Sequence, residues 1–200
     1  MIEKKNYRFC FEIGAGIIIL ISVLWGYLPE PEKINEFTCI SNSAASISLF
    51  VSGVLTAFFD KKLNHMIYGT ILVALMFVFL VCLISLFGQY NMNFRGAYFF
   101  LHVLNPFLLL LYYLMFVKEN KSANRYDVFV MPAFAMLYLV YDYVQGIIDG
   151  SFVYGFLEPS EMTFMYTLLA FIISYTALLF LSILIKLINR TLHFKFNSKQ

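Results

Sequence analysis

Thr38 and His102 are the residues of this 200-residue chain whose types and positions best allow nucleophilic chemistry. A threonine hydroxyl is a weak nucleophile until a neighbouring base takes its proton, and neutral imidazole is the usual base. Each residue lies near one end of a long apolar stretch, Thr38 at the start of one and His102 four residues after Tyr98 in another. The pair predicts acyl transfer, provided that the two stretches bring the side chains together.

Two amide side chains accompany this pair. Asn42 follows Thr38 by four residues and so shares one face of a helix with it, and Asn105 follows His102 by three. An amide beside an imidazole can orient the ring or donate to a developing oxyanion. We expect Asn42 and Asn105 to serve in one of these ways.

A third apolar stretch adds Asp142 and Gln145. At a rise of about 1.5 Å per residue, Asp142 lies about 9 Å and His102 about 6 Å beneath the same membrane face. We expect Asp142 to hold the histidine or to remain protonated, and Gln145 to line the same layer. An alternative stays open, in which His102 and Asp142 form the polar gate of a non-enzymatic module that binds or gates a small solute or lipid. Cys39, beside Thr38, is a minor third candidate for the nucleophile.

The elements that position these residues follow from composition. The chain is 61% hydrophobic and only 13% charged, which is typical of an integral membrane protein. A spanning helix needs about 20 apolar residues to cross a hydrocarbon core about 30 Å thick. The sequence therefore predicts an all-α, polytopic bundle of six transmembrane helices in a single domain over residues 1–200, with spans at 9–28, 38–59, 66–87, 98–117, 128–148 and 163–188.

The distribution of Lys and Arg predicts the orientation of the bundle. With the N-terminus inside, twelve of the fourteen basic residues fall on the inner side, and only Lys33 and Arg95 fall in outer loops. Because basic residues in short loops collect on the cytoplasmic side, we expect a cell-membrane protein with both termini cytoplasmic. Glu12 lies near the inner end of the first span, and we expect its carboxylate to reach the interface there.

Several classes of site are disfavoured by the pattern. Three histidines on opposite sides of the membrane cannot converge on one metal, and the three cysteines show no ligand spacing. Phosphate-cradling glycine loops, dinucleotide fingerprints and Gly-x-Ser-x-Gly elbows are absent from the sequence. We therefore expect no metal and no cofactor. The basic C-terminal residues suit membrane lipid headgroups better than nucleic acid, and no pattern indicates an oligomeric state.

Three segments carry a resemblance to a known family. Glu36-Phe-Thr-Cys-Ile-Ser-Asn and Leu101-His-Val-Leu-Asn-Pro-Phe surround Thr38 and His102, and Gly150-Ser-Phe-Val-Tyr-Gly-Phe-Leu-Glu follows the fifth span. In order and spacing they resemble the androgen-induced membrane proteins, which are threonine hydrolases of fatty acid esters of hydroxy fatty acids, and their six-span bacterial relatives. The chain departs from the family at Gly155, where the family has proline, and at Phe152, where it has tryptophan. The hydrolases also space the proline after the histidine one residue further.

The resemblance implies a role for each of these residues. Thr38 would be the nucleophile and His102 its partner, acting on a fatty-acyl ester that enters from the outer leaflet. The loop with Tyr154, Phe156 and Glu158 would cover the site, so Tyr154 and Glu158 join the expected substrate-binding residues. The expected activity is that of a threonine-type carboxylic ester hydrolase in lipid metabolism.

Overall fold

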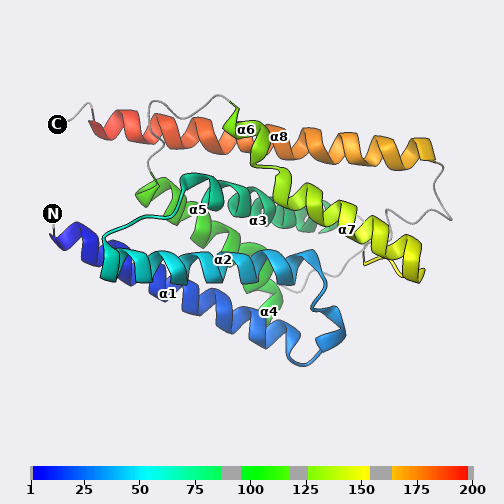
Figure 1. Ribbon diagram of the computed structural model, residues 1–200, viewed down its shortest axis with the longest axis horizontal. Coiled ribbons are helices and arrows are strands. Elements are labelled where there is room, and N and C mark those ends of the chain that lie inside the picture. Colours follow the sequence, from blue (N-terminus) through cyan, green and yellow to red (C-terminus); the bar gives the residue numbers. More distant parts are fainter. Residues whose placement is uncertain (1, 87–95, 118–125, 154–163, 198–200) are drawn as a thin grey trace.

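A computed structural model of the chain is helical throughout its regular elements (Figure 1). It describes residues 2–86, 96–117, 126–153 and 164–197, with side chains for 6–84, 96–117, 126–153 and 164–192. This described part contains six helices that are long and apolar enough to cross a membrane. The predicted all-α fold with six spanning helices is confirmed.

The described residues form helical elements and no strands. They are α1 (Ile2–Tyr27), the short 3-10 turn η1 (Pro31–Lys33), α2 (Phe37–Val54) continuing into η2 (Leu55–Phe59), α3 (His65–Leu86), α4 (Gly96–Phe99) continuing through η3 (Phe100–Leu104) into α5 (Asn105–Phe116), α6 (Asp127–Val130), α7 (Ala133–Asp149) and α8 (Phe164–Asn197).

The predicted spans agree with these helices within a few residues, except at the ends of the chain. The first helix begins at Ile2, and α8 runs on to Asn197 as a helix of 34 residues, because neither terminal stretch contains a helix-breaking glycine or proline. At about 1.5 Å per residue such a helix is about 51 Å long and extends past the hydrocarbon core. Its last turns therefore lie beyond the membrane-spanning part.

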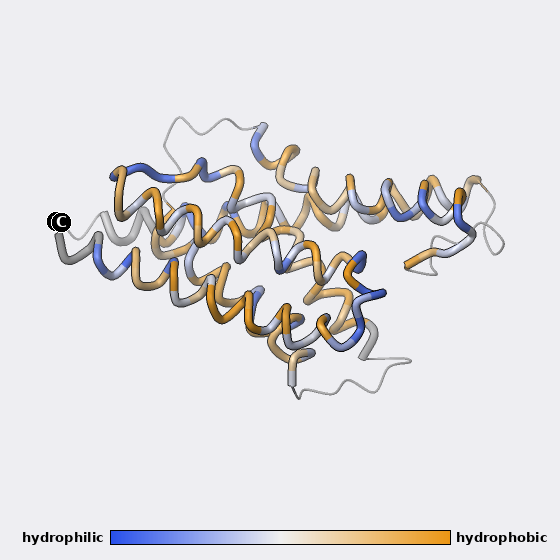
Figure 2. The backbone as a smooth tube through the Cα atoms, turned by 60° about the horizontal axis from the view of Figure 1, so that its bottom comes forward, coloured by the Kyte–Doolittle hydropathy of each residue, from blue (hydrophilic) through white to orange (hydrophobic). Residues whose placement is uncertain are grey.

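The two ends of the bundle can be told apart by the chain's course. The start of α1 and the end of α8 lie at the same end in Figure 1, which we call the inner end. The α1–α2 link, the end of α7 and the start of α8 lie at the opposite, outer end. Figure 2 shows apolar residues along the middle of the helices and most hydrophilic residues toward their ends. This is the pattern expected of helices whose middles face lipid.

Four helices, α1, α2, α3 and α5, supply most of the fully buried apolar side chains of the bundle. α1 and α2 lie side by side along one edge, α3 and α5 lie behind them, and α8 runs along the opposite edge (Figure 1). Ile19, Leu49, Leu72 and Leu109 come from these four central helices and are fully buried. Since lipid is as apolar as these side chains, close packing and buried hydrogen bonds hold the helices together.

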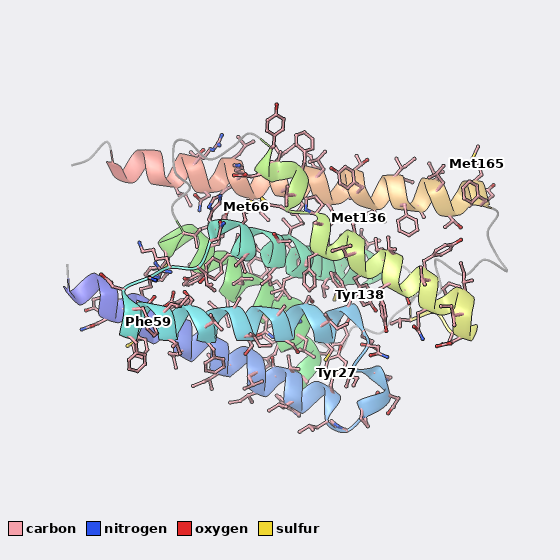
Figure 3. The ribbon with its side chains drawn as sticks, in the orientation of Figure 1. Tyr27, Phe59, Met66, Met136, Tyr138 and Met165 are labelled. Carbon is pink, nitrogen blue, oxygen red and sulfur yellow. The ribbon has the colours of Figure 1, made fainter. Side chains whose placement is uncertain are left out.

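Two tyrosines hold the start of α2, where Thr38 lies. The Tyr27 hydroxyl donates to Glu36 Oε2 at 2.9 Å, and the Tyr138 hydroxyl donates to the Asn35 carbonyl at 2.8 Å. Figure 3 labels both residues, Tyr27 at the end of α1 and Tyr138 on α7. The Phe37 ring packs on Tyr138 with centroids 4.7 Å apart. Helices α1 and α7 thereby fix the first turn of α2.

Two π-helical turns interrupt the spanning helices. One, η2, carries Thr56 near the inner end, and the other, η3, carries His102 near the outer end. In η3 the Asn105 N–H donates to the Phe100 carbonyl, five residues back. A π turn inserts one extra residue, rotates the side chains that follow, and occurs frequently at functional sites.

Candidate functional site

The structure places the Thr38 and His102 side chains against each other at the outer end of the bundle. Thr38 Oγ1 lies 3.5 Å from His102 Nε2. Thr38 is buried in the first turn of α2, and the half-buried His102 reaches it from the π turn η3. The distance is at the long limit for a hydrogen bond, and catalytic contacts are often this long in the absence of substrate.

The second ring nitrogen of His102 determines which tautomer faces Thr38. Nδ1 lies 3.0 Å from the Tyr98 carbonyl oxygen, which can only accept. Nδ1 therefore carries the proton, and Nε2 presents its lone pair to the Thr38 hydroxyl. The Tyr98 ring also stacks on the imidazole with centroids 4.0 Å apart, so one residue fixes both the tautomer and the plane of the ring.

Asn42 connects the two helices that carry the pair. Its Nδ2 donates to the Thr38 carbonyl at 2.8 Å and to the Leu101 carbonyl at 3.2 Å. The first acceptor is the backbone carbonyl of Thr38 itself, and the second belongs to Leu101, the residue before His102. Asn42 therefore fixes the separation of α2 and η3 at the site.

Asn105 continues this hydrogen-bond chain into α1. Its Nδ2 donates to Asn42 Oδ1 and to Ser22 Oγ, each at 2.7 Å. Each Nδ2 has only two protons, so both amide nitrogens are fully used as donors within the bundle. The expectation that Asn42 or Asn105 donates to an oxyanion is not met by this geometry, and the two residues instead position the pair.

The first turn of α2 offers other donors. Its N-cap residue, Glu36, makes no capping hydrogen bond, because its carboxylate accepts from Tyr27. The Thr38 and Cys39 amides belong to the first helical turn, in which N–H groups have no partner within the helix. The uncapped N-terminus also carries a partial positive charge, which favours an anion beside Thr38.

In the described part of the chain, Asp142 and Gln145 form hydrogen bonds within α7 and the segment that follows it, and not with the Thr38 and His102 pair. Asp142 is fully buried and accepts from the Val153 N–H at 2.9 Å, which ties the segment after α7 back to the helix. Gln145 donates to Asp149 along the same helix. Among the described residues, no hydrogen bond joins either side chain to the pair. Tyr154, Phe156 and Glu158 lie outside the described residues.

Cys39 is buried beside Thr38 but is not paired with the base. The His102 ring nitrogens face Thr38 and the Tyr98 carbonyl. The hydroxyl, and not the thiol, is therefore the group from which this imidazole can take a proton.

No protein-family model, curated protein or solved structure matches this chain.

The inner end holds a second polar group that sequence reasoning missed. Glu12 is fully buried, and its Oε1 accepts from Arg8 Nε at 2.8 Å, Ser52 Oγ at 2.6 Å and the Tyr112 hydroxyl at 2.5 Å. The expectation that Glu12 reaches the interface was wrong, because these three donors hold it inside the bundle. An Arg and a Glu four residues apart within one apolar stretch were the available signal.

Proposed function

We propose that this chain is an intramembrane lipid-ester hydrolase with Thr38 as its nucleophile and His102 as its general base. The observation that carries the proposal is the hydroxyl of Thr38, 3.5 Å from Nε2 of an imidazole whose Nδ1 faces the Tyr98 carbonyl. A base held by a third group, next to a hydroxyl, is the arrangement by which hydrolases activate a weak nucleophile. In this chain the third group is the Tyr98 backbone carbonyl, which orients the His102 ring.

The first half of the reaction is acylation of Thr38. Nε2 takes the hydroxyl proton as Thr38 Oγ1 bonds to the ester carbonyl carbon, whose oxygen becomes an oxyanion. The first-turn amides and dipole of α2 stabilise this charge. When the carbon–oxygen bond to the alcohol breaks, the leaving oxygen takes the proton from Nε2, and an acyl-threonine remains.

The second half releases the fatty acid. Water gives a proton to Nε2 and bonds to the acyl carbon, and the bond to Thr38 Oγ1 then breaks as that oxygen recovers the proton. The products are the free fatty acid and the original hydroxyl. This step requires water to reach the acyl carbon from the outer end of the bundle, where the first turn of α2 lies.

The proposed topology places this reaction in the outer leaflet. With the inner end of the bundle in the cytoplasm, the charge bias of the loops is satisfied and the Thr38 and His102 pair lies just beneath the outer face. The acyl chains of the substrate remain in hydrocarbon, and the ester carbonyl meets the pair where water can reach. The substrate class that fits is a fatty-acyl ester dissolved in the membrane.

The gate alternative requires His102 and Asp142 to act together. His102 faces Thr38 and Tyr98, and Asp142 holds Val153. These separate contacts favour the hydrolase. In cells, loss of function in Asp142→Asn with full function in Thr38→Ala would support the gate instead.

The experiment that tests the proposal is hydrolysis by the purified chain in liposomes. Vesicles containing a fatty acid ester of a hydroxy fatty acid should release free fatty acid with the wild type and with Thr38→Ser, which keeps the hydroxyl. Thr38→Val, which keeps the shape and removes the hydroxyl, should be inactive. Equal release by wild type and Thr38→Val would refute the proposal.

A further inference from the structure

The inner polar cluster, which comprises Arg8, Glu12, Ser52, Tyr68 and Tyr112, lies in a part of the bundle that the hydrolase mechanism does not use. The five side chains come from α1, α2, α3 and α5, and all are buried. Arg8 Nη2 donates to the Tyr112 hydroxyl at 2.9 Å, and the Tyr112 hydroxyl lies 3.3 Å from that of Tyr68. Charged residues at membrane depth are rare, and they mark functional sites by default.

Only one of the two carboxylate oxygens of Glu12 has hydrogen-bond partners among the described residues. Oε1 accepts three hydrogen bonds, whereas Oε2, which is fully buried, has no partner in the described part of the chain. The same is true of the buried Thr56 hydroxyl, which lies four residues after Ser52 in the π turn η2. A carboxylate oxygen left without a donor in a low-dielectric interior is strongly unfavourable, so the cluster lacks a donor.

The charges of the cluster restrict what that donor can be. Arg8 and Glu12 form an ion pair at 2.8 Å, and the other groups that face them, Ser52, Tyr68 and Tyr112, are hydroxyls. The cluster is therefore neutral already, and a bound cation would leave an uncompensated positive charge beside Arg8. A neutral donor satisfies Oε2 without this penalty.

We propose that the inner polar cluster is a binding site for a small neutral hydrogen-bond donor, occupied by water, which donates to Glu12 Oε2 with the Thr56 hydroxyl as a second partner. Both atoms are buried, so the bound donor is enclosed by the helices, as is typical of buried waters that pair with otherwise unpartnered polar groups.

The site is separate from the outer pair. Fully buried apolar residues of α1, α2 and α5 lie between the two polar groups, namely Ile19, Leu49 and Leu109. The buried hydroxyls of Ser46 and Ser48 at this level of α2 already donate to the Gly16 and Ala45 carbonyls. A mainly apolar layer whose buried hydroxyls are already bonded to carbonyls offers no good site for a water between the two groups. The inner water therefore does not supply the hydrolytic reaction, and the site stands or falls independently of it.

X-ray radiolytic labelling of the full chain in detergent tests the proposal, because bound water releases hydroxyl radicals next to its neighbours. Tyr112 is fully buried, so it should be modified only if water lies beside it. Met131, which is equally buried and packs against Gly69, is the matched control, and the exposed Tyr126 gives the dose. Modification of Tyr112 without Met131 is expected. An unmodified Tyr112 at doses that modify Tyr126 would overturn the proposal.

Two variants test which atoms hold the water. Thr56→Val removes the hydroxyl with little change of shape and should reduce Tyr112 modification. The double variant Arg8→Met with Glu12→Leu replaces the ion pair by apolar side chains of similar size and should abolish it. If Tyr112 is modified equally in the wild type and in Thr56→Val, and also in the double variant where that variant folds, the water is not held by these groups and the assignment is wrong.

Discussion

Thr38 Oγ1 lies 3.5 Å from His102 Nε2, although 64 positions separate the two residues along the chain. Direct proton transfer requires about 2.6–3.2 Å, so the pair is a few tenths of an ångström from a reactive distance. The backbones on either side are already tied together by Asn42. The proposed acylation therefore requires only a small movement of the pair and no rearrangement of helices.

The Asn42 tie can be tested by removing its amide. Asn42→Ala should lower the rate of Thr38 acylation by about a hundredfold, because a misplacement of about 1 Å at the reacting atoms has an effect of that size. It should also destabilise the fold by about 1–3 kcal/mol, since Asn105 loses an acceptor and two carbonyls lose their donor. The measurement is the acylation rate at saturating substrate.

Ser48→Ala is the matched control for this change. Ser48 is also buried on α2, but its hydroxyl donates to the Ala45 carbonyl of its own helix. Its replacement should leave the acylation rate unchanged. If both variants acylate as fast as the wild type, Asn42 does not position the pair.

The buried ion pair at the inner end predicts a strong asymmetry between single and double changes. Glu12→Leu alone should destabilise the protein by about 3–5 kcal/mol, because Arg8 is left buried without its counter-ion. The double variant Arg8→Met with Glu12→Leu should recover most of that loss. Unfolding in detergent micelles measures both values.

An exposed pair provides the comparison. Glu30 and Lys33 form an ion pair with about half of each side chain exposed, and Glu30→Gln should leave the stability nearly unchanged. A Glu12→Leu effect as small as that of Glu30→Gln would show that the inner pair is solvated.

The proposed orientation predicts which loops are reachable from outside the cell. In a background without the three native cysteines, Lys33→Cys should react with a membrane-impermeant maleimide in intact cells, whereas Lys61→Cys should react only after permeabilisation. These positions lie at opposite ends of the bundle, in the α1–α2 link and after η2. The reverse labelling would place the Thr38 and His102 pair in the inner leaflet.

The reaction should depend on pH in one direction. A protonated imidazole has no lone pair at Nε2 and cannot accept the Thr38 proton, so the acylation rate should rise with pH as His102 loses its charge and then level off. Rates measured from weakly acidic to weakly basic conditions give the profile. A rate that falls as His102 becomes neutral would contradict its role as base.

The fold was predictable because length and apolarity alone determine a spanning helix. The second helix was predicted over 38–59 and extends over Phe37–Phe59. Thr38 with Asn42, and His102 with Asn105, were singled out by polarity within apolar stretches, and the structure brings these four residues together.

The partners of each polar atom were not predictable. Helical spacing places a residue on a face, but it does not determine which acceptor its amide protons reach, so the Asn42 bonds to two carbonyls had no sequence signal. His102 lies in the π turn η3, where its Nδ1 meets the Tyr98 carbonyl, and neither the turn nor this partner was predicted from the sequence. Glu12 was misplaced because two of its three donors, Ser52 and Tyr112, come from other helices.

Acyl-enzyme trapping tests the central claim most directly. The purified protein is treated with a long-chain fluorophosphonate, which reacts with activated hydroxyls, and the labelled peptide is identified by mass spectrometry. The adduct is expected on Thr38, absent in Thr38→Ala and slowed by about 10²–10⁴-fold in His102→Ala. Equal labelling of the wild type and both variants, or an adduct on another residue, would contradict the assignment of Thr38 and His102 as nucleophile and base.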